Sequence, residues 1–115
     1  MAFERFTVVR VPFPFTDRNT TKNRPALVLS DAASFNTPAG HSVMAMITSQ
    51  GNAPGPLDCP IGDLKAAGLP APSLVRFKLF TIDHRLVRGE LSKLAAPDAA
   101  TVRNGLTRLL GDNLR

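Results

Sequence analysis

The chain of 115 residues contains no tryptophan, no tyrosine and only one cysteine, Cys59. A single thiol excludes an internal disulfide and a metal site built from several thiolates, so the sequence gives no support for a redox function. We expect Cys59 to be a small buried or edge residue. Without Trp and Tyr, a stacking platform for single-stranded bases has to come from the seven phenylalanines, several of which fall at predicted core positions.

Long apolar runs and common site motifs are also lacking. No stretch approaches the roughly 18 apolar residues of a membrane span, and residues 1–6 do not begin a secretory signal, so we expect a cytoplasmic protein with no membrane partner. Glycine-rich phosphate loops, paired histidines at metal-ligand spacing and nucleophile elbows are absent, and we expect no metal and no cofactor. The two histidines, His41 and His84, fall in predicted turns. A solvated loop residue is the ordinary interpretation of each, and acid–base work is the alternative.

The composition that remains is that of one globular domain over residues 1–115. Hydrophobic residues make up 43% and charged residues 20%, so disorder is not expected. The net charge is +5 and the isoelectric point is near 10.4, which favours encounters with polyanions such as nucleic acid. Basicity alone is weak evidence, because enzymes that act on small charged substrates share it.

Alternation of β-branched or aromatic residues with polar ones predicts a mainly β protein. The stretch 42–50 is apolar on both faces and should be central and buried. Along 73–83, we expect Val75, Phe77 and Leu79 on the core face, opposite Arg76 and Lys78. Strands are predicted over residues 6–13, 25–30, 42–50, 57–61, 73–83 and 87–94.

Two segments read as helical. Residues 62–72 predict one helical turn ended by Gly68 and the following prolines. The last element begins near Pro97, has Asp98 at the positive end of its dipole, and repeats apolar residues at steps of three and four up to a C-terminal Gly111. Gly105 weakens this helix, so its apolar stripe should dock on the sheet.

Arg24 precedes Pro25, which favours an extended backbone, and the apolar residues that follow predict a buried strand. A guanidinium held rigidly at the mouth of that strand suits a phosphate-like oxyanion. The plainer alternative is a salt bridge that caps the sheet.

Other polar residues gather at strand ends and in one loop. Thr48, Ser49 and Gln50 close the central strand, where hydrogen-bonding caps are their usual role. The loop 16–24 is polar and basic, and it is either a solvated surface or a lip beside Arg24 that contacts phosphates.

The pieces V-P-F-P-F-T-D, R-P-A-L-V-L-S, I-T-S-Q and S-L-V-R-F-K-L-F-T-I-D, followed by a final L-L-G helix, resemble the MazF/PemK family of toxin endoribonucleases. The resemblance covers about residues 8–111. It implies a strongly bent antiparallel sheet of SH3-like barrel type with a C-terminal helix. It also implies a homodimer, an antitoxin partner, and metal-independent, sequence-specific cleavage of single-stranded RNA.

The resemblance places the family's catalytic arginine and threonine on Arg24 and Thr48. In this chemistry the ribose 2′-hydroxyl attacks the adjacent phosphorus and leaves a cyclic phosphate and a 5′-hydroxyl, so stabilisation of the phosphorane is what the protein supplies. Arg24 would neutralise the phosphorane and Thr48 would bind a phosphate oxygen. The residues expected to bind RNA are Ser49, Gln50, Arg76, Lys78, Lys22 and Arg18.

Two departures from the family pattern leave alternatives open. Arg5, Phe6 and Thr7 stand where a Gly-Asp pair usually precedes the first strand, and Lys78 stands where many members carry an acidic residue. A lysine cannot act as a carboxylate base, so the base would be Asp17, His41 or His84, or activity would be weak or absent. A non-cutting binder of RNA or antitoxin is one alternative, and a CcdB-like gyrase poison acting through the C-terminal helix is another.

Overall fold

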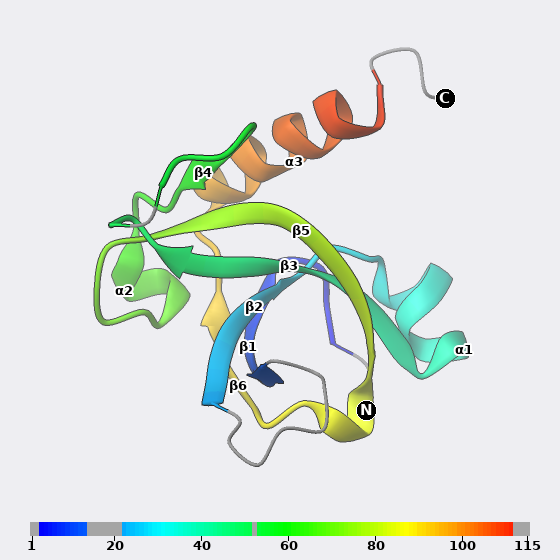
Figure 1. Ribbon diagram of the computed structural model, residues 1–115. Helices are drawn as coiled ribbons and strands as arrows, with labels where there is room; N and C mark the ends of the chain where they lie inside the picture. The colour runs from blue at the N-terminus through cyan, green and yellow to red at the C-terminus, as the bar shows by residue number, and fades with distance from the viewer. Residues whose placement is uncertain (1–2, 14–21, 52, 112–115) are drawn as a thin grey trace.

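A computed structural model describes residues 3–13, 22–51 and 53–111 of the chain. Six strands form one antiparallel sheet in the order β4-β5-β3-β2-β1-β6, curled into a half-barrel (Figure 1). The mainly β fold with a bent sheet and a C-terminal helix is therefore confirmed. The strands are β1 (Thr7–Phe13), β2 (Lys22–Val28), β3 (His41–Ser49), β4 (Cys59–Pro60), β5 (Ser73–Asp83) and β6 (Gly89–Lys93).

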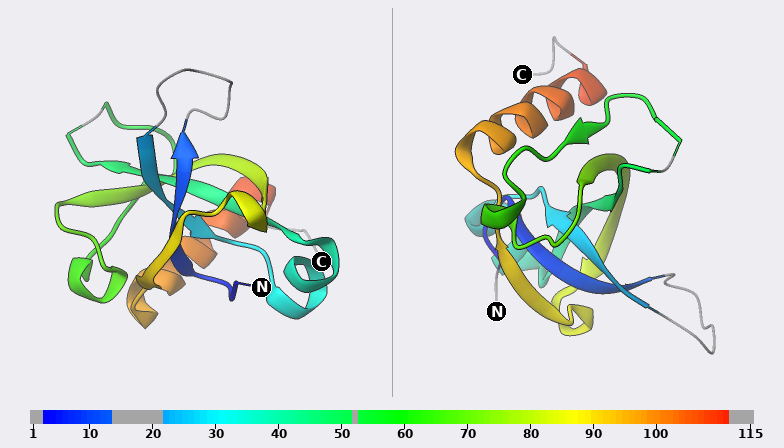
Figure 2. Two further views of the ribbon diagram at one scale, coloured as in Figure 1. Left: turned by 90° about the horizontal axis from the view of Figure 1, so that it is seen from below. Right: turned by 90° about the vertical axis from the view of Figure 1, so that its left-hand side faces the viewer.

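Short helices close the turns, and one longer helix covers the sheet. A π-helical turn (Ala32–Asn36) leads into α1 (Thr37–Ala39), and a 3-10 turn (His84–Leu86) follows β5. The helix α2 (Leu64–Ala67) ends at Gly68, whose φ of 74° is left-handed as the sequence predicts. The last helix, α3 (Ala96–Leu110), lies outside the curl (Figure 2). No helix in the described residues is both long enough and apolar enough to cross a membrane.

Two irregularities in the ladders bend the sheet. Between β3 and β5, Ala45 faces Leu79 while Met46 faces Arg76, so two extra residues stand on β5. Between β1 and β6, Val8 faces Ser92 while Val9 faces Glu90, so one extra residue stands on β6. Extra residues on one strand force that strand to bend and twist.

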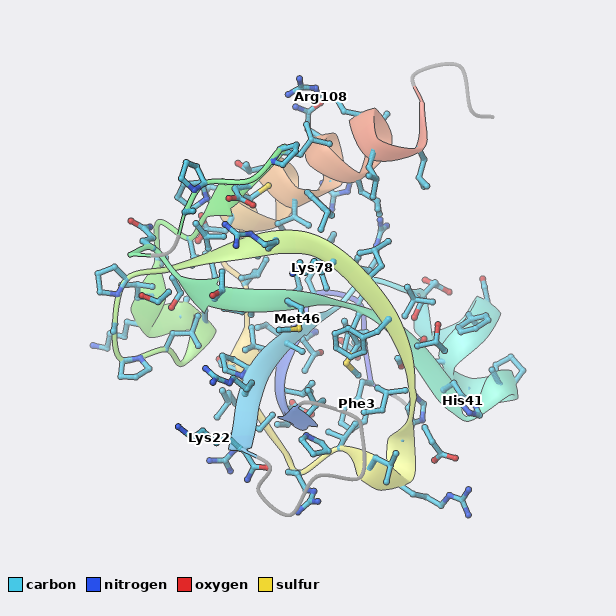
Figure 3. The ribbon with its side chains drawn as sticks, viewed as in Figure 1. Phe3, Lys22, His41, Met46, Lys78 and Arg108 are labelled. Carbon is cyan, nitrogen blue, oxygen red and sulfur yellow. The ribbon has the colours of Figure 1, made fainter. Side chains whose placement is uncertain are left out.

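The sheet buries side chains on both of its faces. On one face Leu27, Ala45 and Val75 pack with Ala99 and Val102 of α3. On the other face, inside the curl, Val9, Met44 and Ile82 pack with Phe3, which is labelled in Figure 3. The sequence pattern of β3, apolar on both sides, is explained by its position between these two cores.

Three details differ from the sequence-based expectations. β2 begins at Lys22, two residues before Arg24. Arg24 therefore lies within the strand, where it pairs with Val11 of β1, rather than at the mouth of the strand. The core assignment of Leu79 is wrong, because this residue is 41% exposed beside Leu106 and Leu110 of α3. The edge strand β4 has only two residues, fewer than the predicted 57–61.

Asp98 connects α3 to the start of α2. Its side chain is buried, and its two carboxylate oxygens accept hydrogen bonds of 2.9 Å from the amides of Gly62 and Asp63. The residue was expected only to complement the helix dipole. It in fact ties the N-terminus of α3 to a segment more than thirty residues earlier in the chain.

We predict that Asp98→Ala lowers the free energy of unfolding by about 2 kcal/mol, because two amides lose a charged acceptor. Asp98→Asn keeps one acceptor oxygen, so it should lower the free energy of unfolding by about half as much as Asp98→Ala. Glu90→Gln, at an exposed carboxylate of β6, is the control and should stay within about 0.5 kcal/mol of the wild type. Urea unfolding of the four proteins measures these differences, and equal stability of Asp98→Ala and the wild type would contradict the prediction.

Candidate functional site

Arg24 and Thr48 line the same cavity, of about 220 Å³, at the end of the sheet near α2. β2 pairs with β3 up to Ala26 and Met46, and each strand continues two residues further, to Arg24 and to Thr48, at the cavity. Because the two strands are neighbours in the sheet, two residues that are far apart in the sequence reach the same cavity. The cavity, here called the Arg24 cavity, is lined by Arg24, Pro25, Ile47, Thr48, Ser49, Leu69, Pro70, Ala71, Pro72 and Ser73.

The Arg24 cavity offers a cation and hydroxyl groups against an apolar wall. Arg24 is exposed, and none of the described residues is hydrogen-bonded or ion-paired to its guanidinium. Thr48 is half-buried, and the segment 69–72 opposite carries two prolines that stiffen the wall. An arginine with its fork available, beside hydroxyls, is suited to an oxyanion such as a phosphate.

The other polar residues at this end of the sheet have different positions. Ser49 lines the cavity and its hydroxyl accepts a 3.2 Å hydrogen bond from the Gly51 amide. Gln50 lies beside the cavity, and its amide donates to the carbonyl of Ser73 at 3.2 Å. Lys22 is exposed at the start of β2 (Figure 3). Arg18 and Asp17 lie outside the described residues.

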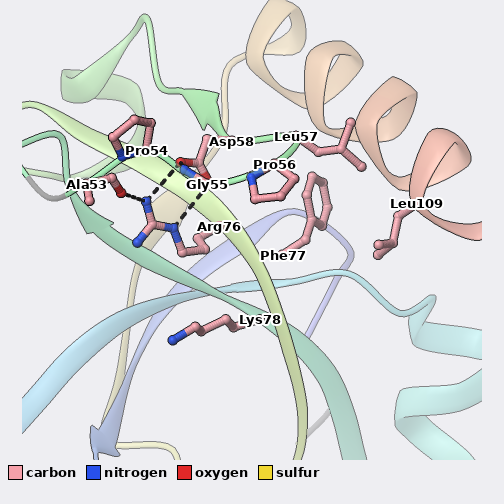
Figure 4. A pocket seen from close by; sticks show the side chains of 10 residues that line it. All are labelled: Ala53, Pro54, Gly55, Pro56, Leu57, Asp58, Arg76, Phe77, Lys78 and Leu109. Atoms are coloured by element: carbon pink, nitrogen blue, oxygen red, sulfur yellow. Dashed lines mark hydrogen bonds and ion pairs between the residues drawn. The ribbon is translucent and has the colours of Figure 1, made fainter.

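Arg76 and Lys78 line a second cavity, of about 450 Å³, between β5, α3 and the segment that precedes β4 (Figure 4). This space, here called the Arg76 cavity, is lined by Ala53, Pro54, Gly55, Pro56, Leu57, Asp58, Arg76, Phe77, Lys78 and Leu109. Lys78 is exposed, whereas the guanidinium of Arg76 is ion-paired with Asp58 at 2.9 Å. Of the predicted RNA-binding residues, Ser49 therefore lines the Arg24 cavity, and Arg76 and Lys78 line the Arg76 cavity.

The ion pair controls the ionisation of Asp58. Hydrogen bonds from the Arg76 guanidinium hold the pKa of the Asp58 carboxyl below its ordinary value of 3.8, with a further contribution from the Gly55 amide. The neighbouring Cys59 is 4% exposed, and burial raises the pKa of its thiol. Cys59 is thus the buried edge residue that the sequence predicts, and it is not an activated nucleophile.

Neither histidine lies at the Arg24 cavity. His41 begins β3 and Thr48 is seven residues further along the strand, a separation of about 23 Å. His84 is half-buried rather than solvated, with Nε2 2.7 Å from the hydroxyl of Ser42 and its ring edge-on to Phe3. In the described part of the chain, no three His, Cys, Asp or Glu side chains are grouped to hold a metal ion.

Sequence reasoning missed Asp58 and the proline-containing wall at 69–72. The one available signal for Asp58 was a lone carboxylate in a segment rich in proline and glycine, and this signal does not say which cation it pairs with. No sequence pattern indicated that residues 69–72 form a wall of the Arg24 cavity, because these residues are apolar and belong to a turn.

The curled sheet with an outer C-terminal helix, and an arginine and a threonine together at one end, define a small β protein with a site suited to phosphate groups. The model of one family matches residues 4–110, and its members are described as PemK-like, MazF-like toxins of type II toxin-antitoxin systems. The chain belongs to this family.

Solved structures of the family share the fold. MazF from Deinococcus radiodurans superposes with a TM-score of 0.73 at 26% identity, over 96% of this chain and 98% of that chain. A MazE–MazF structure from the same organism superposes with a TM-score of 0.75 at 27% identity, over 96% of this chain and 98% of that chain. An endoribonuclease in complex with its cognate antitoxin, from a mycobacterial species, superposes with a TM-score of 0.73 at 18% identity. The match covers 96% of this chain and 94% of that chain. No curated protein matches the sequence.

The Arg76–Asp58 pair predicts a pH dependence of stability. The folded-state pKa of Asp58 is lowered, so the stabilisation is fully present above the ordinary pKa of 3.8 and is lost as the pH falls through the lowered value. At pH 6, Asp58→Asn should reduce the free energy of unfolding by about 1–3 kcal/mol, and the difference from the wild type should shrink toward pH 2. Urea unfolding at several pH values measures it, and a difference that stays constant with pH would contradict the assignment.

Proposed function

We propose that the chain is the toxin of a toxin-antitoxin pair and cuts single-stranded RNA at specific sequences without a metal ion. The observation that carries the proposal is the shared cavity of Arg24 and Thr48, in a chain that belongs to the MazF-like toxin family. The mycobacterial structure of the same fold is described as an endoribonuclease.

The proposed reaction is an internal transesterification of the RNA. The 2′-oxygen forms a bond to the adjacent phosphorus, its proton passes to a base, and the bond from phosphorus to the 5′-oxygen breaks as that oxygen gains a proton. The products are a cyclic phosphate and a 5′-hydroxyl. The protein's part is to hold the phosphate and to stabilise the negative charge of the phosphorane.

Arg24 and Thr48 are assigned to that stabilisation. The Arg24 guanidinium binds two oxygens of the phosphorane through its fork, and the Thr48 hydroxyl donates a hydrogen bond to one of them. Ser49, Gln50, Lys22 and Arg18 contact the flanking RNA, and Lys78 supplies a further cation. Lys78 cannot accept the 2′-proton while it carries its charge, and both histidines are far from the cavity, so no base is assigned.

We also propose an antitoxin partner and a homodimer. The relatives from Deinococcus radiodurans include MazE–MazF structures, and a chain of net charge +5 favours an acidic partner.

The homodimer is supported by an exposed apolar surface. Leu79 and Leu110 are 41% and 55% exposed beside a cavity of about 260 Å³ whose walls are almost entirely apolar. An exposed apolar patch of this kind supports a second copy as the occupant.

The ribonuclease proposal predicts cleavage of a long single-stranded RNA in excess EDTA, with cyclic phosphate ends at the cut sites. Arg24→Ala and Thr48→Ala should each reduce the cleavage rate by about 100-fold or more, as expected when one donor to the transition state is removed. Arg24→Lys keeps the positive charge but lacks the forked guanidinium, so its cleavage rate should lie between those of the two alanine variants and that of the wild type.

Arg85→Ala is the matched control, because it removes an arginine whose partner is Asp83 and which does not line the Arg24 cavity. Its rate should equal that of the wild type. If the wild type leaves RNA intact in EDTA but binds it with a steep salt dependence, the protein is a non-cutting binder and the catalytic assignment fails.

The homodimer proposal predicts that Leu79→Glu shifts the protein to a monomer in light scattering, because a buried unpaired carboxylate opposes association. Leu86→Glu changes a leucine that is 50% exposed and does not line the apolar cavity, and it should remain dimeric. A wild type that is monomeric at all concentrations tested would refute the homodimer.

A further inference from the structure

The Arg76 guanidinium is bound to the protein's own loop rather than left open to a ligand. Its Nε donates to Asp58 Oδ1 at 3.2 Å, and its Nη2 donates to Asp58 Oδ2 at 2.9 Å and to the carbonyl of Ala53 at 2.6 Å (Figure 4). This is a two-point contact with a carboxylate plus a third contact five residues earlier in the chain. One side chain on β5 thereby holds both ends of the segment 53–58.

The same segment is braced from within. The other donor to Asp58 Oδ2 is the Gly55 amide at 2.7 Å, and the Asp58 amide lies 3.4 Å from the Gly55 carbonyl. Leu57 has a φ of 63°, in the left-handed region that leucine rarely adopts. Two prolines, Pro54 and Pro56, limit the remaining backbone freedom. These constraints restrict the shape of the segment, and the Arg76–Asp58 contact fastens it to β5 beside the pairing of Cys59 with Val75.

Release of Arg76 to an incoming phosphate would be unfavourable. The side chains of Arg76 and Asp58 are only 21% and 10% exposed, so a departing guanidinium would leave a mostly buried carboxylate without its partner. Lys78 is two residues along the same strand, exposed, and turned to the same side as Arg76 in Figure 4. The cation available to RNA in the Arg76 cavity is therefore Lys78.

The held segment forms one wall of a space next to the proposed cutting site. β5 pairs directly with β3 through Thr48 and Leu74 and through Met46 and Arg76, so the Arg76 cavity begins one strand away from Thr48. Its volume, its apolar wall at Pro54, Pro56 and Leu57, and the ring of Phe77 suit the flat face of a base that flanks the cut phosphate.

We propose that Arg76 is a positioning residue, which fixes the segment 53–58 through Asp58 and thereby sets which RNA sequence the protein cuts. This rests on the ribonuclease function proposed above. It differs from the expectation, drawn from the family resemblance, that Arg76 contacts the neighbouring phosphate.

Hydrogen exchange without RNA tests the fastening itself. In Arg76→Ala, the direct acceptor of the Gly55 amide is still present, so faster exchange at Gly55 reports release of the whole segment. We expect exchange at Gly55 and Asp58 to quicken by about tenfold or more, with the amides of β3 unchanged. Lys78→Ala, the control on the same strand, should leave both amides as in the wild type. Unchanged exchange in Arg76→Ala would overturn the proposal.

Cut-site mapping tests the role in RNA selection. Arg76→Ala and Asp58→Asn should broaden the set of sequences cut in the same way, and the double variant should be no broader than either single one, because the two residues act as a unit. The slope of binding against salt concentration should stay the same in Arg76→Ala and fall by about one in Lys78→Ala, which loses a phosphate contact.

The opposite pattern would overturn the proposal. If Arg76 binds phosphate, Arg76→Ala lowers the salt slope with the cut sites unchanged, and Asp58→Asn strengthens binding by freeing the guanidinium. A wild type that cuts no RNA refutes the ribonuclease function and with it the role in selection, while the exchange measurement still decides whether Arg76 fastens the segment.

Discussion

The register shift between β3 and β5 is the constraint on which the rest of the structure depends. Two extra residues on β5, between the pairs Ala45–Leu79 and Met46–Arg76, bend the longest strand of the sheet in its middle. The bend gives the sheet its curl and so creates the inner core. Phe77, one of the two extra residues, packs against the outer core, and its ring lies so near Gly105 that a β-carbon on Gly105 would be 2.9 Å from it. Gly105, a weak residue for a helix, is thus the residue that lets α3 approach β5.

The sequence was a good guide to the elements whose patterns are local. β5 has the predicted bounds, α2 ends at Gly68, and β3 is central because it is apolar on both faces. Failures occurred where a long-range contact decides the outcome. Leu79 follows the alternation that puts Val75 and Phe77 in the outer core, but it is 41% exposed beside Leu106 and Leu110, because no local pattern encodes how far α3 covers β5.

The candidate site shows the same division. Arg24 and Thr48 were predicted as candidates from strand-end chemistry and from the family resemblance, and both line one cavity at the ends of neighbouring strands. Spacing did not identify the partner of Arg76, because Asp58 lies 18 residues earlier in the chain, with β4 and α2 between the two residues. The position of Arg76 on β5 was therefore predictable from the sequence, whereas its partner Asp58 was not.

The described cations of this protein differ in whether a carboxylate compensates their charge. Arg76, Arg85 and Lys93 are paired with Asp58, Asp83 and Glu4, so their charges are largely compensated locally. Lys22, Arg24 and Lys78 are exposed, and no described residue pairs with them. The last three lie on β2 and β5, the two strands that flank β3. If the chain binds RNA as proposed above, these three charges would lie on both sides of Thr48, where a phosphate chain would cross the end of β3.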